Sequence, residues 1–177
     1  PANAIGSAVR DPSTGDVWAL AANNYGPYRK WSRATQTWTT AVANGWSEDR
    51  HSLAFDSSRN RVISLPAGGS INTVTTFNSD GSGLTTTPNP NAFQFAGMTV
   101  YCPDIDRLVH LSNYPHILRL IHPTTFVATT VTQNGWTIPS ETYSSDQPHS
   151  RFFYVPAYKG VCFFNSVHAN VRFMRLA

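Results

Sequence analysis

Short apolar runs alternate with polar turns along this chain of 177 residues, and the alternation repeats. In residues 7–20 an apolar run leads into the polar turn DPSTGD, and a second apolar run follows the turn. Residues 52–65, 99–111 and 150–164 have the same order. Asp, Ser, Pro, Gly and Asn favour tight turns between antiparallel strands. The pattern therefore predicts a β-hairpin in each of these segments.

The repeat continues beyond the hairpins. A third strand-like run follows each of the first three hairpins, and a fourth begins seven residues after the third ends. The third runs end at Trp31, Phe77 and Ile121, and the fourth runs begin at Trp38, Leu84 and Ala128. Equivalent positions in the second strands, Val17, Val62, Leu108 and Val161, are 45, 46 and 53 residues apart. The repeating unit is therefore four antiparallel strands.

A four-stranded unit at this period is typical of a β-propeller blade. Blades that stack side by side bury both of their faces, which accounts for short but dense apolar runs. An immunoglobulin-like sandwich also has short, evenly spaced strands, but it does not require the sequence to repeat. We therefore predict an all-β fold, a β-propeller of four-stranded antiparallel blades, with about three and three-quarter blades at 6–50, 51–97, 98–148 and 149–177.

Two segments resemble kelch-type blades. In YRKWSRATQTWTT (28–40) an aromatic residue ends one strand, a Thr-containing turn follows and a Trp opens the next strand. VISLPAGG (62–69) is similar to the kelch double glycine after the second strand, whereas AANN (21–24) and SNYP (112–115) have no glycine pair. The resemblance covers the whole chain as a strand pattern and only these segments as a motif. It implies a propeller scaffold.

The last predicted blade has only three strand-like runs, RFFYV, VCFFN and VRFMRL. Residues 1–5 are barely long enough to supply a fourth strand. The chain could therefore be part of a propeller of six to eight blades, a small four-bladed ring, or one of two copies that complete a ring. Exposed blade faces and unpaired edge strands are costly. We expect further chain or a protein partner, including a second copy.

Charge and composition narrow the partners. The net charge is +3, and the basic residues occur singly rather than in a run interleaved with aromatic residues, which argues against nucleic-acid binding. No hydrophobic run reaches membrane length, so membrane insertion is not expected. Low charge and many Thr, Ser and Asn residues favour an extracellular or particle-associated protein, such as part of a virion or cell-surface assembly.

The candidate binding residues lie in links between the fourth strand of one blade and the first strand of the next. ANGWSEDRH (43–51) and QNGWTIPSETYSSDQPH (133–149) share an Asn-Gly-Trp turn and a terminal His, whereas PNPNAFQFAG (88–97) lacks the Trp and the charges. Loops on a rigid scaffold commonly carry binding groups. The candidate ligand-binding residues are Trp46, Glu48, Asp49, Arg50, His51, Trp136, Glu141, Tyr143, Asp146 and His149.

Each of these groups has two interpretations. Trp46 and Trp136 could form a flat platform for a sugar ring, or could fill the gap between neighbouring blades, which is the interpretation we favour. Carboxylates near a histidine could act as general acid and base or hold a cation, but solvated loop residues that bond to turn amides fit the pattern better. A metal shared by His51 and His149 would need further ligands that the sequence does not identify.

Other chemistry has less support. His110, His116 and His122 recur every six residues, which does not place them together, and the turns DPSTGD and PDIDR lack the calcium-loop pattern and read as Asx-type turns. Some kelch-like propellers are copper oxidases with a Tyr–Cys pair, but Tyr101 and Cys102 are adjacent and should face opposite sides of a strand. No nucleophile motif occurs. We predict no catalytic residue, metal site or cofactor.

The function expected from the sequence is a non-enzymatic binding or structural module. It would present its inter-blade loops to a protein or a glycan within a larger assembly. The alternative is a propeller-type glycan-processing enzyme that uses the loop carboxylates Glu48, Asp49, Glu141 and Asp146. A third hypothesis is an assembly subunit without a ligand, in which the incomplete fourth blade is the interaction site.

Overall fold

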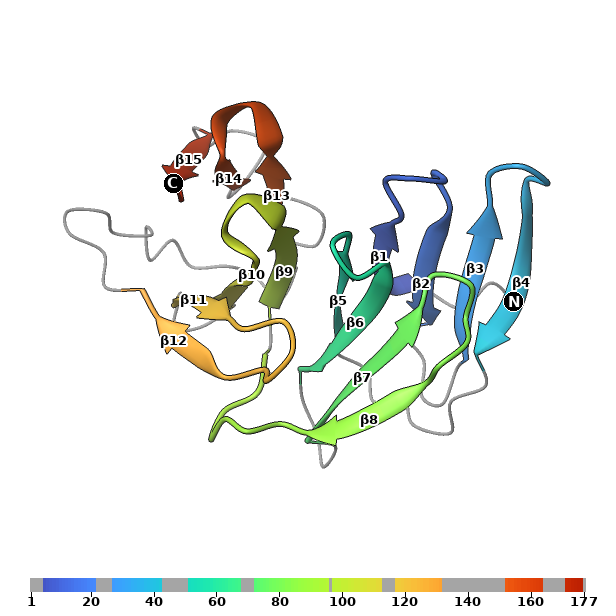
Figure 1. The fold of residues 1–177 in the computed structure, drawn as a ribbon, viewed down its shortest axis with the longest axis horizontal. Coiled ribbons are helices and arrows are strands. Elements are labelled where there is room, and N and C mark those ends of the chain that lie inside the picture. Colours follow the sequence, from blue (N-terminus) through green and yellow to red (C-terminus); the bar gives the residue numbers. More distant parts are fainter. Residues whose placement is uncertain are drawn as a thin grey trace. The chain divides into compact units, whose positions relative to one another are not determined.

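The computed structural model describes residues 5–21, 27–42, 51–67, 72–95, 97–112, 117–131, 152–163 and 171–176. Within these ranges the chain forms four antiparallel sheets and two short 3-10 segments, with no α-helix (Figure 1). The described part of the chain contains no helix of the length and apolarity that a membrane span requires. The prediction of an all-β chain built from repeated antiparallel units is confirmed.

The strands of each sheet follow one another in chain order, so every sheet is an up-and-down meander. Sheet A contains β1 (Ile5–Arg10), β2 (Val17–Ala21), β3 (Tyr28–Ser32) and β4 (Thr37–Val42). Sheet B contains β5 (His51–Asp56), β6 (Arg61–Pro66), β7 (Thr73–Asn78) and β8 (Thr85–Pro88). Sheet C contains β9 (Gly97–Cys102), β10 (Arg107–Ser112), β11 (Leu118–Ile121) and β12 (Ala128–Thr130). Sheet D contains β13 (Phe152–Val155), β14 (Gly160–Phe163) and β15 (Arg172–Arg175).

Carboxylates hold the first turns of sheets A and B. Asp11 Oδ1 accepts hydrogen bonds from the backbone N–H of Ser13 at 2.8 Å and from its hydroxyl at 2.7 Å, which is the predicted Asx-type turn. Burial alone would raise the pKa of Asp11, but the hydrogen bonds from Ser13 and Thr14 outweigh burial and lower it. The buried Asp56 instead pairs with Arg59 and Arg61, its Oδ2 lying 3.3 and 3.1 Å from their guanidinium nitrogens.

Sheets C and D use a different first turn. A single 3-10 turn begins at a proline in each sheet, η1 (Pro103–Ile105) and η2 (Pro156–Tyr158). The next residue closes the turn in the left-handed region, with φ of 48° at Asp106 and 49° at Lys159. Tyr101 donates its hydroxyl to Asp106 at 2.7 Å, so this carboxylate bonds to a side chain. The turn at 103–107 is therefore not the predicted Asx-type turn, because the proline fixes the backbone of the 3-10 turn.

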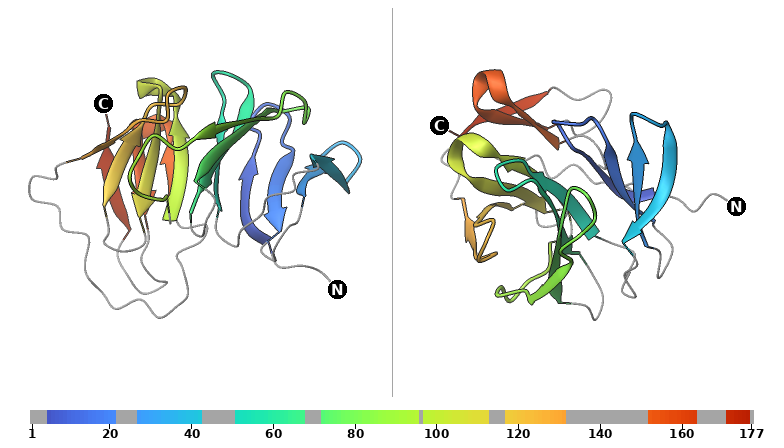
Figure 2. Two further views of the ribbon diagram at one scale, coloured as in Figure 1. Left: turned by 90° about the horizontal axis from the view of Figure 1, so that it is seen from below. Right: turned by 45° about the vertical axis from the view of Figure 1, so that its right-hand side comes forward.

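The chain divides into two compact units, residues 1–96 and 97–177. In the first unit, sheets A and B lie side by side (Figures 1 and 2). The ring of Phe77 on β7 lies 4.8 Å, centroid to centroid, from both Trp18 on β2 and Tyr28 on β3. The backbone N–H of Leu53 also donates to the Ser7 hydroxyl at 3.1 Å, which joins the first strands of the two sheets.

In the second unit, an apolar cluster joins sheets C and D. Its buried members include Cys102, Val109 and Leu118 of sheet C and Phe152 and Phe163 of sheet D. Each unit is therefore a pair of sheets with an apolar core between them, as expected for neighbouring propeller blades.

Candidate functional site

Nearly all of the sequence-predicted site residues lie outside the described residues, and the structure does not test them. They are Trp46, Glu48, Asp49, Arg50, Trp136, Glu141, Tyr143, Asp146 and His149. His51 is the first residue of β5, where its backbone is opposite Pro66 in the neighbouring strand. The first of the two links therefore leads directly into the first strand of sheet B.

The link between β8 and β9, which has no Trp and no charge, is described from residue 89 to residue 95. Asn89 is buried at its start and organises it. The backbone N–H of Asn89 donates to the Asn72 carbonyl at 2.9 Å. The Asn89 side chain donates through Nδ2 to Asn72 Oδ1 at 2.9 Å and to the Phe93 carbonyl at 2.8 Å. The link is thereby fixed to the residue that precedes β7.

The carbonyl oxygen of the Asn89 side chain is also fully engaged. Its Oδ1 accepts from the backbone N–H of Asn91 at 3.1 Å and from Asn91 Nδ2 at 2.7 Å. A primary amide has two donor hydrogens and two acceptor lone pairs, so Asn89 uses its whole hydrogen-bonding capacity. A buried amide satisfied in this way is costly to disturb, which keeps the link in one conformation.

An aromatic pair holds the second half of the link. Phe95 is fully buried, and its backbone N–H donates to the Pro66 carbonyl at 2.7 Å. The half-buried ring of Phe93 packs against Phe95 edge to face, with centroids 5.4 Å apart and an angle of 74° between the rings. Phe93 is therefore held in place from within the fold while part of its surface reaches solvent.

An open depression of about 410 Å³ lies against this link. This site is here named the link pocket, and its lining residues are Asn72, Asn91, Ala92, Phe93 and Gln94. The volume is within the range of small-molecule sites. Three amide side chains, a phenyl ring and a methyl group form the lining, and none of them titrates near neutral pH. The lining amides can donate and accept hydrogen bonds, and none of the described lining residues could act as a general acid or base.

The link pocket was not predicted from the sequence, because its link lacks the Trp and the charged residues that mark the other two links. The sequence does contain one indication of this site, the segment NPNAFQF (89–95), which is rich in amide and aromatic side chains. The contribution of Asn72 could not be read from the sequence, because Asn72 and Asn89 are 17 residues apart and meet only when β7 pairs with β8.

Sheet D carries a second feature, an exposed row of side chains. Phe153 is opposite Cys162, and Cys162 is opposite Phe173, in the pairing of β13, β14 and β15. Directly opposed residues lie on the same face of a sheet, so these three residues form one row, here named the aromatic row. Phe153 is 40% exposed and Phe173 is 44% exposed. The opposite face of the sheet packs on sheet C.

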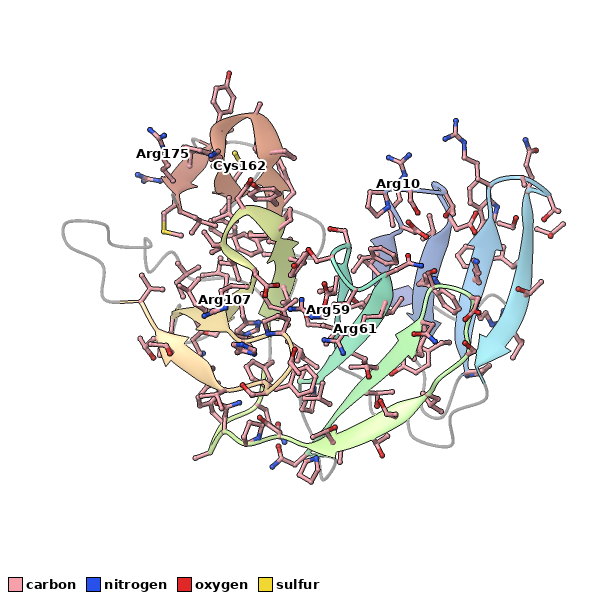
Figure 3. The ribbon with its side chains drawn as sticks, viewed as in Figure 1. Arg10, Arg59, Arg61, Arg107, Cys162 and Arg175 are labelled. Carbon is pink, nitrogen blue, oxygen red and sulfur yellow. The ribbon has the colours of Figure 1, made fainter. Side chains whose placement is uncertain are left out.

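The end of the aromatic row is extended by Tyr158 of η2, which is 68% exposed and meets Phe173 edge to face at 5.9 Å. A side-chain carbon placed on Gly160 would collide with the Phe173 ring, so the ring lies directly over this glycine. Figure 3 shows Cys162 and Arg175 on the same sheet. The aromatic row is apolar and accessible, which is typical of a surface that contacts another protein.

The buried titratable groups of sheet C have a structural role. His110 is fully buried, and its Nδ1 lies 3.0 Å from the Thr99 hydroxyl. Burial, aided by the charge of Arg119, lowers the pKa of His110 to about 3, so the ring is neutral. His122 accepts from the backbone N–H groups of Thr124 and Thr125, both at 3.2 Å, and holds the turn after β11. His116 lies outside the described residues.

Cys102 and Cys162 are both free thiols. Cys102 is buried in the apolar cluster, and burial, with a contribution from Asp104, raises its pKa to about 12. Burial also raises the pKa of the Cys162 thiol. Across the described ranges, no three His, Cys, Asp or Glu side chains group closely enough to hold a metal ion.

No protein-family model and no curated protein matches the sequence. A chain of the nidogen/laminin complex matches the structure with a TM-score of 0.68 at 11% identity, over 99% of this chain and 62% of that chain. A protein of unknown function from Bacteroides thetaiotaomicron matches with a TM-score of 0.66 at 14% identity, over 98% of this chain and 41% of that chain. The WD40 repeats of RRP9 match with a TM-score of 0.52 at 13% identity, over 73% of this chain and 38% of that chain.

The chain thus spans about three fifths or less of the length of each of these structures. WD40 repeats are propeller blades of four antiparallel strands, the unit that sheets A, B and C each form. The meander order of the sheets and these likenesses together establish that the chain has a β-propeller fold.

Proposed function

We propose that this chain is a non-enzymatic protein-binding module, and that its first partner is a second copy of the same chain. The observation that carries the proposal is the aromatic row of sheet D. Phe153 and Phe173 expose about two fifths of their surfaces on a face whose reverse side is already buried against sheet C. Burying a Phe side chain contributes roughly 1.5–3 kcal/mol of favourable free energy, so burial of the aromatic row is a substantial driving force for association.

A propeller blade is the partner that fits this face best. The same kind of contact already occurs in each unit, where an aromatic or aliphatic face of one sheet packs on the face of the next. In the first unit this contact includes edge-on aromatic rings at 4.8 Å. A blade that docks on the aromatic row would extend this blade-to-blade packing across the exposed face of sheet D.

A second copy can supply a matching face from sheet A. Val17 is opposite Trp31, and Trp31 is opposite Trp38, so these residues share the face that points away from Trp18. Trp38 is 47% exposed. Arg10, opposite Val17, lies on the same face, and a guanidinium over an aromatic ring is attractive. Indole rings and an arginine can therefore cover the aromatic row of the other copy.

The two longer inter-blade links, with the residues from Trp46 to His51 and from Trp136 to His149, would form further contacts with the partner or with a glycan. The assembly would be extracellular or particle-associated. The relationship to kelch-type blades is supported by the WSRATQTW segment at 31–38. One solved chain with a similar fold comes from the nidogen/laminin complex, and this likeness supports a binding role.

Sedimentation analysis of the 177-residue chain tests the proposal. The wild-type chain should shift from monomer to dimer or a larger closed assembly as its concentration rises. A Phe153→Ser, Phe173→Ser double variant should remain monomeric, because it removes the apolar groups that drive association. Leu84→Ser is the matched control, since Leu84 is 40% exposed just before β8, away from sheet D, and should associate like the wild type. A wild-type chain that stays monomeric at all concentrations would refute association with a second copy.

A further inference from the structure

We propose that the link pocket binds a neutral saccharide. The pocket is formed by Asn72 and by residues 91–94 of the link between β8 and β9. It belongs to the first unit, whereas the aromatic row belongs to sheet D, so this inference is independent of the assembly proposed above.

The first support is rigidity. Asn89 makes one backbone and four side-chain hydrogen bonds, which fix both ends of the link segment that lines the pocket. Phe95 is buried beneath the link and fixes its last part. A site that is already ordered loses little conformational entropy when a ligand binds, which matters most for small, weakly binding ligands such as sugars.

The second support is the chemistry of the amides. A sugar hydroxyl donates one hydrogen bond and accepts others, and a primary amide offers a donor and an acceptor side by side. Asn72 turns its carbonyl oxygen toward Asn89, and Asn91 turns its amide nitrogen toward Asn89. The amide nitrogen of Asn72 is therefore the end that does not face Asn89. Gln94 adds a third amide to the lining.

The third support is an apolar surface beside the amides. The Phe93 ring is held edge to face by Phe95 and lines the pocket together with the Ala92 methyl group. The face of an aromatic ring carries partial negative charge. The C–H bonds on one side of a pyranose ring carry partial positive charge, so a sugar can stack on Phe93 while its hydroxyl groups reach the amides.

The described lining residues carry no charge, and this favours one class of ligand. None of Asn72, Asn91, Ala92, Phe93 and Gln94 is ionised, so a phosphate, sulfate or carboxylate in the pocket would lose hydration without gaining a counter-charge from these residues. A neutral saccharide has no such cost. The geometry therefore favours uncharged pyranosides over uronic acids or sialic acids.

The test is a titration of the 177-residue chain with defined sugars, followed by nuclear magnetic resonance of side-chain amides and by saturation transfer. The neutral probes are methyl β-D-glucopyranoside, methyl β-D-galactopyranoside and methyl α-D-mannopyranoside, and the anionic comparison is glucuronate. At least one neutral probe should shift the amide signals of Asn72, Asn91 and Gln94, and glucuronate should bind more weakly.

Two variants locate the site. Gln94→Ala should weaken the affinity for the neutral probe about fivefold, which is the usual effect of losing one hydrogen bond. Phe93→Leu keeps an apolar side chain on Phe95 but removes the ring face, and it should weaken binding by a similar factor. Thr40→Ala, at an exposed position on sheet A, is the control and should bind like the wild type.

Three results would overturn the inference. These are no binding of any neutral probe, binding of glucuronate as tight as that of the neutral probes, or unchanged binding by both Gln94→Ala and Phe93→Leu. The Phe153→Ser, Phe173→Ser variant separates the two proposals, because it should lose self-association and still bind the sugar. If it loses sugar binding as well, the pocket is not independent of the assembly, and the inference fails in this form.

Discussion

The indole ring of Trp18 and the phenyl ring of Phe77 meet edge to face, with their centroids 4.8 Å apart, and both rings are buried. Trp18 lies on sheet A and Phe77 on sheet B, so this contact joins two consecutive blades. The stability of the first unit should depend strongly on it.

We predict that Phe77→Ala lowers the free energy of unfolding by about 3–5 kcal/mol, because it removes a ring that contacts both Trp18 and Tyr28 and leaves a cavity. Denaturant unfolding followed by tryptophan fluorescence measures the change. Leu84→Ala, at an exposed position on the link to β8, is the control and should cost less than about 1 kcal/mol. Equal effects of the two substitutions would show that Phe77 is not a core contact.

The ammonium group of Lys30 on sheet A contacts both its own sheet and the turn after β7 of sheet B. Its Nζ lies 3.0 Å from Asp16 Oδ2, donates to the Ser79 carbonyl at 3.0 Å, and lies 5.5 Å from the Trp18 ring centroid. We predict that Lys30→Met lowers the free energy of unfolding by about 1–3 kcal/mol, since it removes a charged donor from a partly buried site.

The same substitution should raise the pKa of Asp16. The backbone N–H of Arg33 and then the hydrogen bond and charge of Lys30 hold this pKa below its ordinary value of 3.8. A carboxyl whose pKa is lower in the folded chain than in the unfolded chain stabilises the fold at pH values above its unfolded-state pKa. This stabilisation is lost as the pH falls through its folded-state pKa. In Lys30→Met the Asp16 pKa should rise but remain low, because the Arg33 amide still donates. An unchanged pKa, measured by nuclear magnetic resonance titration, would contradict the pairing.

Gly97 begins β9 with a φ of 149°, a conformation that other residues rarely adopt. A side-chain carbon at this position would collide with the backbone carbonyl of Leu111, which is fixed by its place in β10. We predict that Gly97→Ala lowers the free energy of unfolding by about 2 kcal/mol or more, through backbone strain and this collision. Thermal unfolding measures the loss, and a midpoint within experimental error of the wild type would contradict the prediction.

His110 should make the fold less stable as the solution becomes acidic. Burial, aided by Arg119, lowers its folded-state pKa from 6.5 to about 3. Between these values the unfolded chain takes up a proton that the folded chain excludes, so stability falls as pH falls from 6.5 toward 3. His110→Asn, which keeps a hydrogen-bonding group near Thr99 and does not titrate, should show a shallower decline over about pH 4.5–6.5. If the free energy of unfolding changes with pH equally in the variant and the wild type, a group other than His110 causes the pH dependence.

The strand repeat was predictable from sequence because it depends on local signals. Apolar runs and turn residues alternate with a fixed spacing around Val17, Val62 and Leu108, and each of these residues lies in the second strand of its sheet. The aromatic row could also have been read from the sequence. Runs such as FFYV and VCFF are apolar at consecutive positions, which indicates that both faces of sheet D are apolar.

The candidate site was less accessible from sequence. The link pocket depends on an amide network between Asn72 and Asn89 that forms only after β7 and β8 pair. At 103–107, Asp104 and Asp106 predict an Asx-type turn, but the structure has a 3-10 turn that begins at Pro103. The residues of the two longer links, including Trp46 and Trp136, lie outside the described residues and remain predictions.

Cys162 reports directly on association through the aromatic row, since it lies between Phe153 and Phe173. The buried Cys102 is an internal control. The decisive measurement is the rate of thiol alkylation of Cys162 as a function of protein concentration, followed by mass spectrometry. If a second copy covers the aromatic row, the rate should fall as concentration rises, and this dependence should vanish in the Phe153→Ser, Phe173→Ser variant. A Cys162 alkylation rate that is the same at every concentration would contradict the proposed assembly.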